Sequence, residues 1–245
     1  MKRNIIAIGG GDIRQQQTLA IDKEIVQFSG KKQPTLLFIP TASSDKVSYC
    51  DEIRELFSDL GCLVDVLYLI KERPSTSIIE QKILSADIIY VGGGNTLKMM
   101  TLWRRLGIDI LLNQARAQGA ILCGVSAGSI CWFNYGNSDS RKDKNLDADY
   151  IKVTGLGFID AFHCPHHDTE HERKASLKKM MQKCSGIAIA LDDCVALQIV
   201  DDTYRIISSR EKASAYKIYW KLDKFYKEKI EAITNFKPLH ELLRK

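Results

Sequence analysis

The sequence lacks the features that mark several classes of protein. No apolar run approaches the roughly 20 residues that cross a bilayer, so we expect no membrane-spanning segment. The seven cysteines are scattered and include no CxxC pair. Most lie in apolar runs, where a free cysteine behaves as a small hydrophobe, so we expect a reduced, cytoplasmic protein. The net charge of +5 is too mild to indicate a nucleic acid or a membrane surface as a partner.

Nucleotide-binding motifs are absent as well. Gly9–Asp12 follows a short apolar run, but it has neither the GxGxxG spacing of a dinucleotide site nor the GK[ST] ending of a P-loop. We interpret it as a turn at the end of a buried strand. The remaining composition, 45% hydrophobic and 27% charged over 245 residues, is ordinary for a soluble globular protein. Without repeats, a linker or a clear boundary, we expect one domain over residues 1–245.

The first half of the chain alternates between apolar runs and amphipathic patterns. The runs predict buried strands, and apolar residues spaced three or four apart predict helices. Expected strands are 4–8, 34–39, 63–69, 86–91 and 120–123, and expected helices are 17–29, 46–60, 76–84, 107–118 and one that begins near 97. This alternation is typical of an α/β fold with a doubly wound, mostly parallel sheet and helices on both faces.

The second half has a different pattern. Residues 134–149 are polar and predict a loop, the kind of segment that carries functional side chains or covers a site. The stretches 151–158 and 159–162 then lead to a histidine-rich segment, and further expected elements are a helix at 170–183, a strand at 187–191 and a C-terminal β-hairpin that joins 196–200 to 204–208. In 217–227 apolar residues alternate with lysines, which indicates an edge strand with protective charges rather than a nucleic-acid surface.

The most informative stretch is Gly124-Val125-Ser126-Ala127-Gly128. It follows an expected strand and precedes apolar residues that suit the start of a helix. This is the setting of a nucleophile elbow, in which a tight turn raises the serine to the edge of the sheet. The amide of Ala127 would then point where an oxyanion forms. A plain glycine turn between strand and helix is the alternative.

Four of the five histidines lie between positions 163 and 171. A metal site that uses His163, Cys164, His166, His167 or His171 is one interpretation, but adjacent residues cannot all face one ion and no second cluster has ligand spacing. The other is a single general base, which a serine nucleophile needs because its hydroxyl is barely ionised near neutral pH.

Two further groups complete this hypothesis. Asp139, between the serine and the histidines, would orient the imidazole, which gives the chain order serine, aspartate, histidine. A second glycine turn, Gly92–Asn95, ends another expected strand, and the carboxyl ends of parallel strands meet at one edge of a sheet. An N–H of Gly93 or Gly94 would be the second oxyanion donor, and Asn95 is a candidate for substrate binding or for capping the next helix.

Three motifs occurring in order carry a family resemblance. Val91–Thr96, Gly124–Gly128 and Cys164-Pro165-His166 resemble peptidase family S51, which includes aspartyl dipeptidase and cyanophycinase. The resemblance covers about residues 4–210 and implies a fold related to the class I glutamine amidotransferases. Cys164 stands where the family has asparagine.

The resemblance also implies residue roles. Ser126 matches the family's nucleophile and His166 its base. Asp139 lies close to the family's acid, with Asp143 and Asp147 as fallbacks. Members that favour aspartyl substrates need a cation in the pocket, and Arg173 lies near where the dipeptidase has arginines.

Asp192 and Asp193 follow the strand 187–191 and match an acidic position of the family that could hold a substrate amino group; a turn role is the alternative. Together these residues predict a serine hydrolase without metal or other cofactor, a monomer or homodimer. It would cleave short peptides in the manner of a dipeptidase, with an aspartyl preference. A non-catalytic binding protein, a serine esterase and a metalloprotein remain alternatives.

Overall fold

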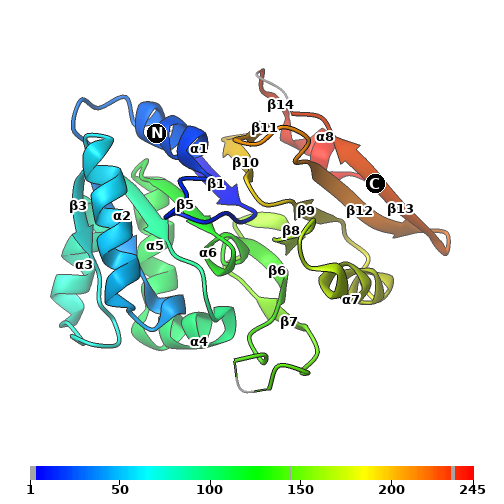
Figure 1. The fold of residues 1–245 in the computed structure, drawn as a ribbon, viewed down its shortest axis with the longest axis horizontal. Helices are drawn as coiled ribbons and strands as arrows, with labels where there is room; N and C mark the ends of the chain where they lie inside the picture. Colours follow the sequence, from blue (N-terminus) through cyan, green and yellow to red (C-terminus); the bar gives the residue numbers. More distant parts are fainter. Residues whose placement is uncertain (1–3, 144, 233–234) are drawn as a thin grey trace.

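Two β-sheets form the framework of the protein (Figure 1). The computed structural model describes residues 4–143, 145–232 and 235–245, so Lys144 of the predicted 134–149 loop and residues 1–3 of the expected domain lie outside the described part. The larger sheet has the strand order β14-β11-β10-β1-β5-β4-β2-β3, and the smaller one has the order β13-β12-β9-β8-β6-β7.

The larger sheet contains the strands of the first half of the chain. Its strands are β1 (Asn4–Ile8), β2 (Thr35–Ile39), β3 (Leu63–Val66), β4 (Ile88–Val91), β5 (Ile121–Val125), β10 (Val195–Val200), β11 (Thr203–Ser208) and β14 (Lys237–Pro238). The first five pair in parallel, as predicted, and β10, β11 and β14 extend the sheet by antiparallel pairing. The β10–β11 pair is the predicted hairpin.

Helices cover both faces of this sheet (Figure 1). They are α1 (Leu19–Phe28), α2 (Val47–Asp59), α3 (Thr76–Ser85), α4 (Thr96–Leu106), α5 (Ile108–Ala117) and the short α6 (Ala127–Ile130), with a 3₁₀ turn at Thr41–Ser43. Alternate strand residues face opposite sides. Ile6 and Ile8 pack with α1 and α2, whereas Ile5 and Ala7 belong to the cluster that includes α3, α4 and α5. Burying each such side chain stabilises the fold by roughly 1.5–3 kcal/mol.

The smaller sheet was not predicted as a separate unit. It contains β6 (Phe133–Ser138), β7 (Ile151–Thr154), β8 (Ile159–Cys164), β9 (Ala188–Leu191), β12 (Ala215–Lys221) and β13 (Lys224–Ile230), and the remaining helices are α7 (His171–Gln182) and α8 (Leu239–Leu243). Strand β6 corrects the first part of the predicted loop. Its polar Asn137 and Ser138 are buried: the Asn137 amide donates to the Arg173 carbonyl and the Ser138 hydroxyl bonds that of Ser140, contacts that a hydrophobicity pattern does not reveal.

The stretch 217–227 is likewise two strands rather than one. β12 and β13 form a hairpin whose turn is Leu222–Asp223, both with positive φ (49° and 57°). Two successive positive φ values are typical of a tight hairpin turn, which glycine or asparagine usually marks. Leucine at the first position hid this turn in the sequence. Among the described residues no helix has both the length and the apolar character to cross a membrane.

Candidate active site

Ser126 sits in a strained turn where β5 ends and α6 begins. Its φ and ψ are 55° and −113°, a region that non-glycine residues rarely adopt and that costs about 1–3 kcal/mol. Its N–H donates to the carbonyl of Ile8 at 3.1 Å, which ties the turn to the end of β1. The flanking glycines are required by packing: a Cβ on Gly124 would lie 2.4 Å from the carbonyl oxygen of Gly128, and one on Gly128 would lie 2.1 Å from that of Val91.

His166 lies beside this serine. The chain turns immediately after β8, with a positive φ of 53° at His166, and its N–H donates to the carbonyl of Gly9 at 3.1 Å. The ring Nε2 is 2.9 Å from Ser126 Oγ, and the ring Nδ1 is 2.6 Å from Oδ1 of Asp193. A carboxylate on Nδ1 fixes the tautomer in which Nε2 accepts a proton. The arrangement can therefore deprotonate the serine hydroxyl.

The acid on His166 is Asp193, which corrects the prediction of Asp139. Burial raises the pKa of the Asp193 carboxyl, but the hydrogen bonds and charges of His166, Thr169 and Arg210 together outweigh that effect and the net shift is downward. Asp139 instead lies 3.4 Å from the guanidinium of Arg173 and is half exposed. Asp193 follows β9, and its position at the end of an expected strand was the feature of the sequence that could have pointed to it as the acid.

The two fallback acids also lie elsewhere. Asp143 accepts a hydrogen bond from the Asn95 amide at 2.6 Å and pairs with Lys98 at 3.2 Å. The backbone N–H of Asp147 donates to the side chain of Asn145 at 3.1 Å. Neither carboxylate has a recorded contact with His166.

Two of the three predicted oxyanion donors, Gly93 and Ala127, lie beside Ser126. A Cβ on Gly93 would be 3.5 Å from Ser126 Cβ, so this glycine faces the serine. Its N–H donates to the Tyr49 hydroxyl at a long 3.4 Å. Gly94 has a φ of 131°, and a Cβ there would lie 2.3 Å from the Ala42 carbonyl oxygen, so no side chain fits. Ala127 is the first residue of α6.

Two of the predicted substrate-binding residues are satisfied within the protein. Asn95 caps α4 by accepting from the N–H of Lys98 at 2.9 Å, and its amide donates to the Ser140 carbonyl at 2.8 Å. Asp192 accepts from the N–H of Ser214 at 2.9 Å. Both side chains are buried. The helix-capping and turn alternatives therefore describe these two residues.

Arg173, the predicted cation of the pocket, is only 1% exposed. Its guanidinium pairs with Glu170 at 2.7 Å, donates to the Asn137 carbonyl at 2.9 Å and lies 3.4 Å from Asp139. These contacts join α7 to β6 and to the segment after it. An arginine with this set of internal partners stabilises the fold, so another cation has to be considered for binding a substrate carboxylate.

The neighbouring histidines have separate environments. His163 is buried, with Nε2 2.8 Å from Ser129 Oγ and Nδ1 2.9 Å from the Ile189 carbonyl. Burial lowers the pKa of His163 and of His167 to about 3, so both rings are neutral. His167 packs against the ring of Tyr216. Across the described residues no group of three side chains has the arrangement of a metal site.

Gly10 is a site residue that the sequence analysis missed. A Cβ at this position would lie 2.0 Å from Asp193 Oδ1 and 2.4 Å from His166 Nδ1. The Gly9–Asp12 turn therefore does more than end β1, because its backbone leaves the space that the histidine and aspartate occupy. The glycine run at the end of a strand was the signal in the sequence, but the need for glycine is clear only once His166 and Asp193 are seen beside it.

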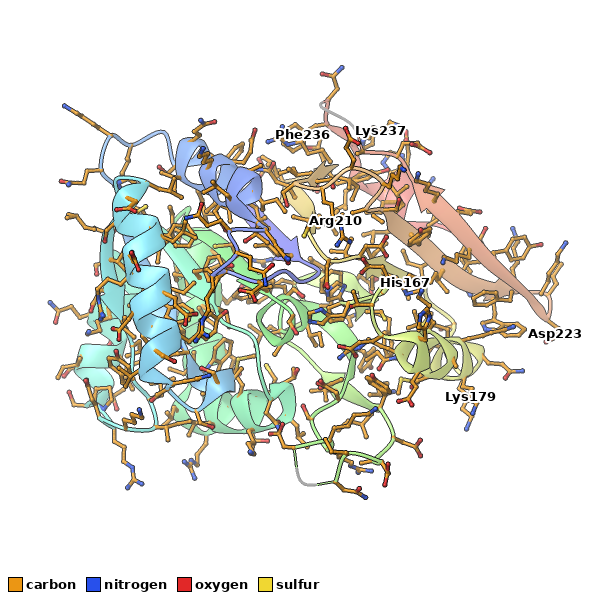
Figure 2. The ribbon with its side chains drawn as sticks, in the orientation of Figure 1. His167, Lys179, Arg210, Asp223, Phe236 and Lys237 are labelled. Carbon is orange, nitrogen blue, oxygen red and sulfur yellow. The ribbon has the colours of Figure 1, made fainter. Side chains whose placement is uncertain are left out.

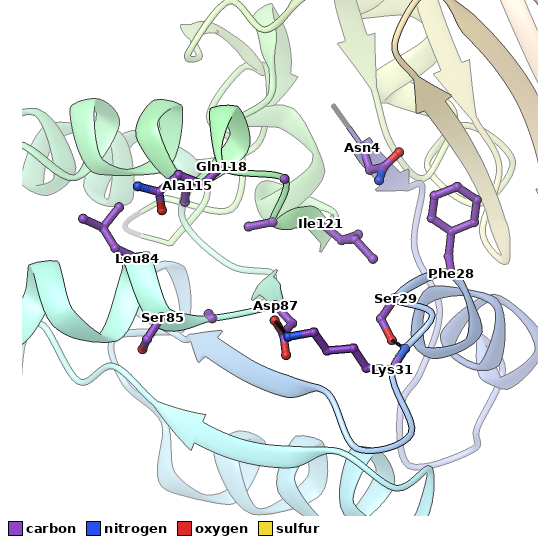
Figure 3. Close-up of a pocket in the computed structure, with 13 residues that line it drawn as sticks. Asn4, Phe28, Ser29, Lys31, Leu84, Ser85, Asp87, Ala115, Gln118 and Ile121 are labelled. Atoms are coloured by element: carbon purple, nitrogen blue, oxygen red, sulfur yellow. Dashed lines mark hydrogen bonds and ion pairs between the residues drawn. The ribbon is translucent and has the colours of Figure 1, made fainter. Parts of the chain in front are cut away.

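Two cavities lie at opposite ends of the larger sheet. One of about 380 Å³ is lined by the segments after β1 and β2 together with Tyr90 and Val125, the residue before Ser126. The other, of about 480 Å³, lies where β1 and β5 begin and is lined by Asn4, Ile121 and the Lys31–Asp87 ion pair (Figure 3). Only the first is at the end of the sheet that carries Ser126.

Comparison with known proteins decides the family. A family model, described as peptidase family S51, matches residues 5–207. The chain belongs to peptidase family S51. This confirms the resemblance drawn from the three motifs and identifies the protein with a family of peptidases.

Relatives and solved structures agree with this membership. The chain is 35% identical over 221 residues to the uncharacterized peptidase YgaJ of Bacillus subtilis, covering 88% of this chain and 92% of the relative. It is 28% identical over 131 residues to Peptidase E of Nostoc, covering 52% and 51%. A peptidase structure from an acI-B1 actinobacterium shares the S51 fold with a TM-score of 0.70 at 17% identity, covering 96% of each chain. A putative peptidase E structure from Listeria monocytogenes has a TM-score of 0.64 at 21% identity, covering 85% of this chain and 99% of that one.

Proposed function

We propose that this family S51 member is a serine peptidase that cleaves short peptides through an acyl-enzyme on Ser126. The observation that carries the proposal is the continuous pair of hydrogen bonds from Ser126 Oγ to His166 and from His166 to Asp193, 2.9 Å and 2.6 Å long. A nucleophile, a base and a group that orients the base are the parts that acyl transfer needs. The strained turn at Ser126 supports the same role.

The reaction follows from these positions. Ser126 Oγ attacks the scissile carbonyl while His166 Nε2 takes the hydroxyl proton, and the Asp193 carboxylate stabilises the imidazolium that forms. Amides of Ala127 and of Gly93 or Gly94 receive the oxyanion, a contribution of about 10²- to 10³-fold per donor. His166 then gives its proton to the departing amine. A water deprotonated by the same nitrogen releases the acid.

We propose substrates of dipeptide and tripeptide size with an acidic residue at the amino terminus. The cavity beside Val125 is bordered by two cations, Arg14 and Lys46, and by the carboxylates of Asp12 and Glu52. Arg14 already pairs with Glu52 at 2.6 Å. Lys46 forms no ion pair within the described part of the chain, so its ammonium can bind a substrate carboxylate.

We also propose a cytoplasmic location, which the unpaired state of all seven cysteines supports.

The test is cleavage of a library of dipeptides and tripeptides, including α- and β-aspartyl members, followed by mass spectrometry. Wild-type protein and Ser126→Ala are compared, with Ser77→Ala on α3 as the matched control. We expect cleavage by the wild type and the control and at least a 10³-fold loss in Ser126→Ala. Cleavage that survives in Ser126→Ala contradicts the serine mechanism. Turnover of matched esters without peptides would favour an esterase, and binding without turnover would favour a non-catalytic relative.

A further inference from the structure

The acid of the site is itself held by a second aspartate. The backbone N–H of Asp193 donates to Oδ1 of Asp168 at 2.8 Å. Asp168 lies two residues after His166, so the segment that contains His166 also forms a hydrogen bond with the backbone of Asp193. The Asp193 side chain receives a further hydrogen bond from the Thr169 hydroxyl at 3.3 Å. The relative position of the base and the acid therefore depends on where Asp168 points.

Arg210 determines that direction. Its guanidinium forms a close ion pair with Oδ2 of Asp168, the oxygen that does not hold Asp193. Arg210 (labelled in Figure 2) lies on the connection that leads from β11 of the larger sheet to β12 of the smaller sheet. The preceding residue, Ser209, donates its N–H to the Cys194 carbonyl at 2.9 Å. The β11–β12 connection therefore contacts both Asp168, two residues after His166, and Cys194, the residue after Asp193.

The Arg210–Asp168 ion pair also changes the electrostatic environment of Asp193. The groups that face Asp193 are His166, the Asp168 carboxylate and the Arg210 guanidinium, with Asp192 and Cys194 as its chain neighbours. Without Arg210 the negative charge of Asp168 would be uncompensated beside Asp193. Arg210 is one of the groups that lower the pKa of Asp193 against the opposing effect of burial.

We propose that Arg210 is a positioning residue for catalysis: through Asp168 it holds Asp193 in line with His166. The proposal rests on the proposed function of Ser126. Arg210 touches neither the serine nor the histidine, so its effect on the serine is transmitted through Asp168 and Asp193. The Arg210 side chain is 45% exposed, and solvent screening limits the effect to about tenfold.

The experiment measures phosphonylation of Ser126 by a fluorophosphonate probe as a function of pH. The variants are Arg210→Ala, Arg210→Lys and Arg205→Ala, where Arg205 pairs with Glu24 at 2.7 Å and serves as the matched control. We expect labelling by Arg210→Ala to slow about tenfold because Asp193 is no longer held in line with His166, with its acidic limb moved toward higher pH because loss of a nearby cation favours protonation of the His166–Asp193 pair. Arg210→Lys keeps the charge and should recover most of the pH profile. An Arg210→Ala profile that matches Arg205→Ala overturns the proposal.

A second measurement separates this proposal from the proposed function. The Nδ1 proton between His166 and Asp193 is expected as a downfield proton resonance, which can be observed whether or not Ser126 reacts. If wild-type Ser126 resists the probe, the serine mechanism fails, but Arg210→Ala should still shift or broaden this resonance while Arg210→Lys retains it. An unchanged resonance in a folded Arg210→Ala protein would contradict the positioning role.

Discussion

The two halves of the site are built in different ways. Ser126 belongs to the larger sheet, where a strand, a turn and a helix that are consecutive in the chain create the elbow. His166 follows β8 of the smaller sheet, and Asp193 lies on the connection that leaves β9 and enters β10 of the larger one. The proposed nucleophile is thus placed by local geometry, and its proposed base and acid are placed by the way the two sheets join. Changes at the junction should therefore affect activity without altering the elbow.

The largest effect at the junction is expected from the acid. Asp193→Asn should lower kcat/KM by about 10³-fold, because an amide in place of the carboxylate favours the wrong tautomer of His166 and leaves the imidazolium unstabilised. Asp139→Asn is the matched control, since Asp139 contacts Arg173 instead, and it should change kcat/KM by less than about threefold. Peptide cleavage by the two purified variants decides the matter. A larger loss in Asp139→Asn would restore the original assignment.

The next effect concerns the turn after β1. Gly10→Ala should lower kcat by about 10²-fold, because the added Cβ would displace the Asp193–His166 pair and small misplacements of catalytic groups carry penalties of that order. Gly186→Ala is the control, since a Cβ there meets no atom within 4 Å. Steady-state kinetics with circular dichroism as a folding check provides the comparison. Equal activities would show that the pair tolerates a shift.

A smaller effect is expected from the pocket. Lys46→Ala should raise KM about fivefold for peptides with an acidic amino-terminal residue and leave kcat unchanged, because an exposed ion pair contributes about 1 kcal/mol. Lys23→Ala, on α1, should leave both constants unchanged. The same KM increase for neutral peptides would remove Lys46 from the account of specificity.

The buried histidines next to the junction predict a dependence of stability on pH. Between pH 6.5 and about 3 the unfolded chain protonates His163 and His167 while the fold keeps them neutral, so the free energy of unfolding falls as the pH falls. Asp22 acts in the opposite direction: burial raises its pKa from 3.8 to about 7, so its contribution is lost as the pH rises through that range. Two histidines outweigh one aspartate. Urea unfolding should therefore show decreasing stability toward acid, and a steeper decrease in Asp22→Asn; a flat profile would contradict this.

The comparison also shows what the sequence could predict. The parallel sheet, the strand–turn–helix at Ser126 and the importance of His166, which lies beside that serine, were accessible because each depends on a short pattern at the end of one strand. The acid was missed because its position requires two pairings far apart in the chain, β8 with β9 and β1 with β10. The role of Arg173 was misjudged for a related reason: its partners Asn137 and Asp139 come from a polar strand and turn that looked like a loop.

The measurement that tests the central claim most directly is the site of covalent labelling. Wild-type protein treated with a fluorophosphonate should carry a single adduct, located by peptide mass spectrometry on Ser126. His166→Ala should abolish labelling, Asp193→Asn should slow it strongly, and Asp139→Asn should label at the wild-type rate. An adduct on another residue, or labelling of Ser126 that does not depend on His166 and Asp193, would contradict the account.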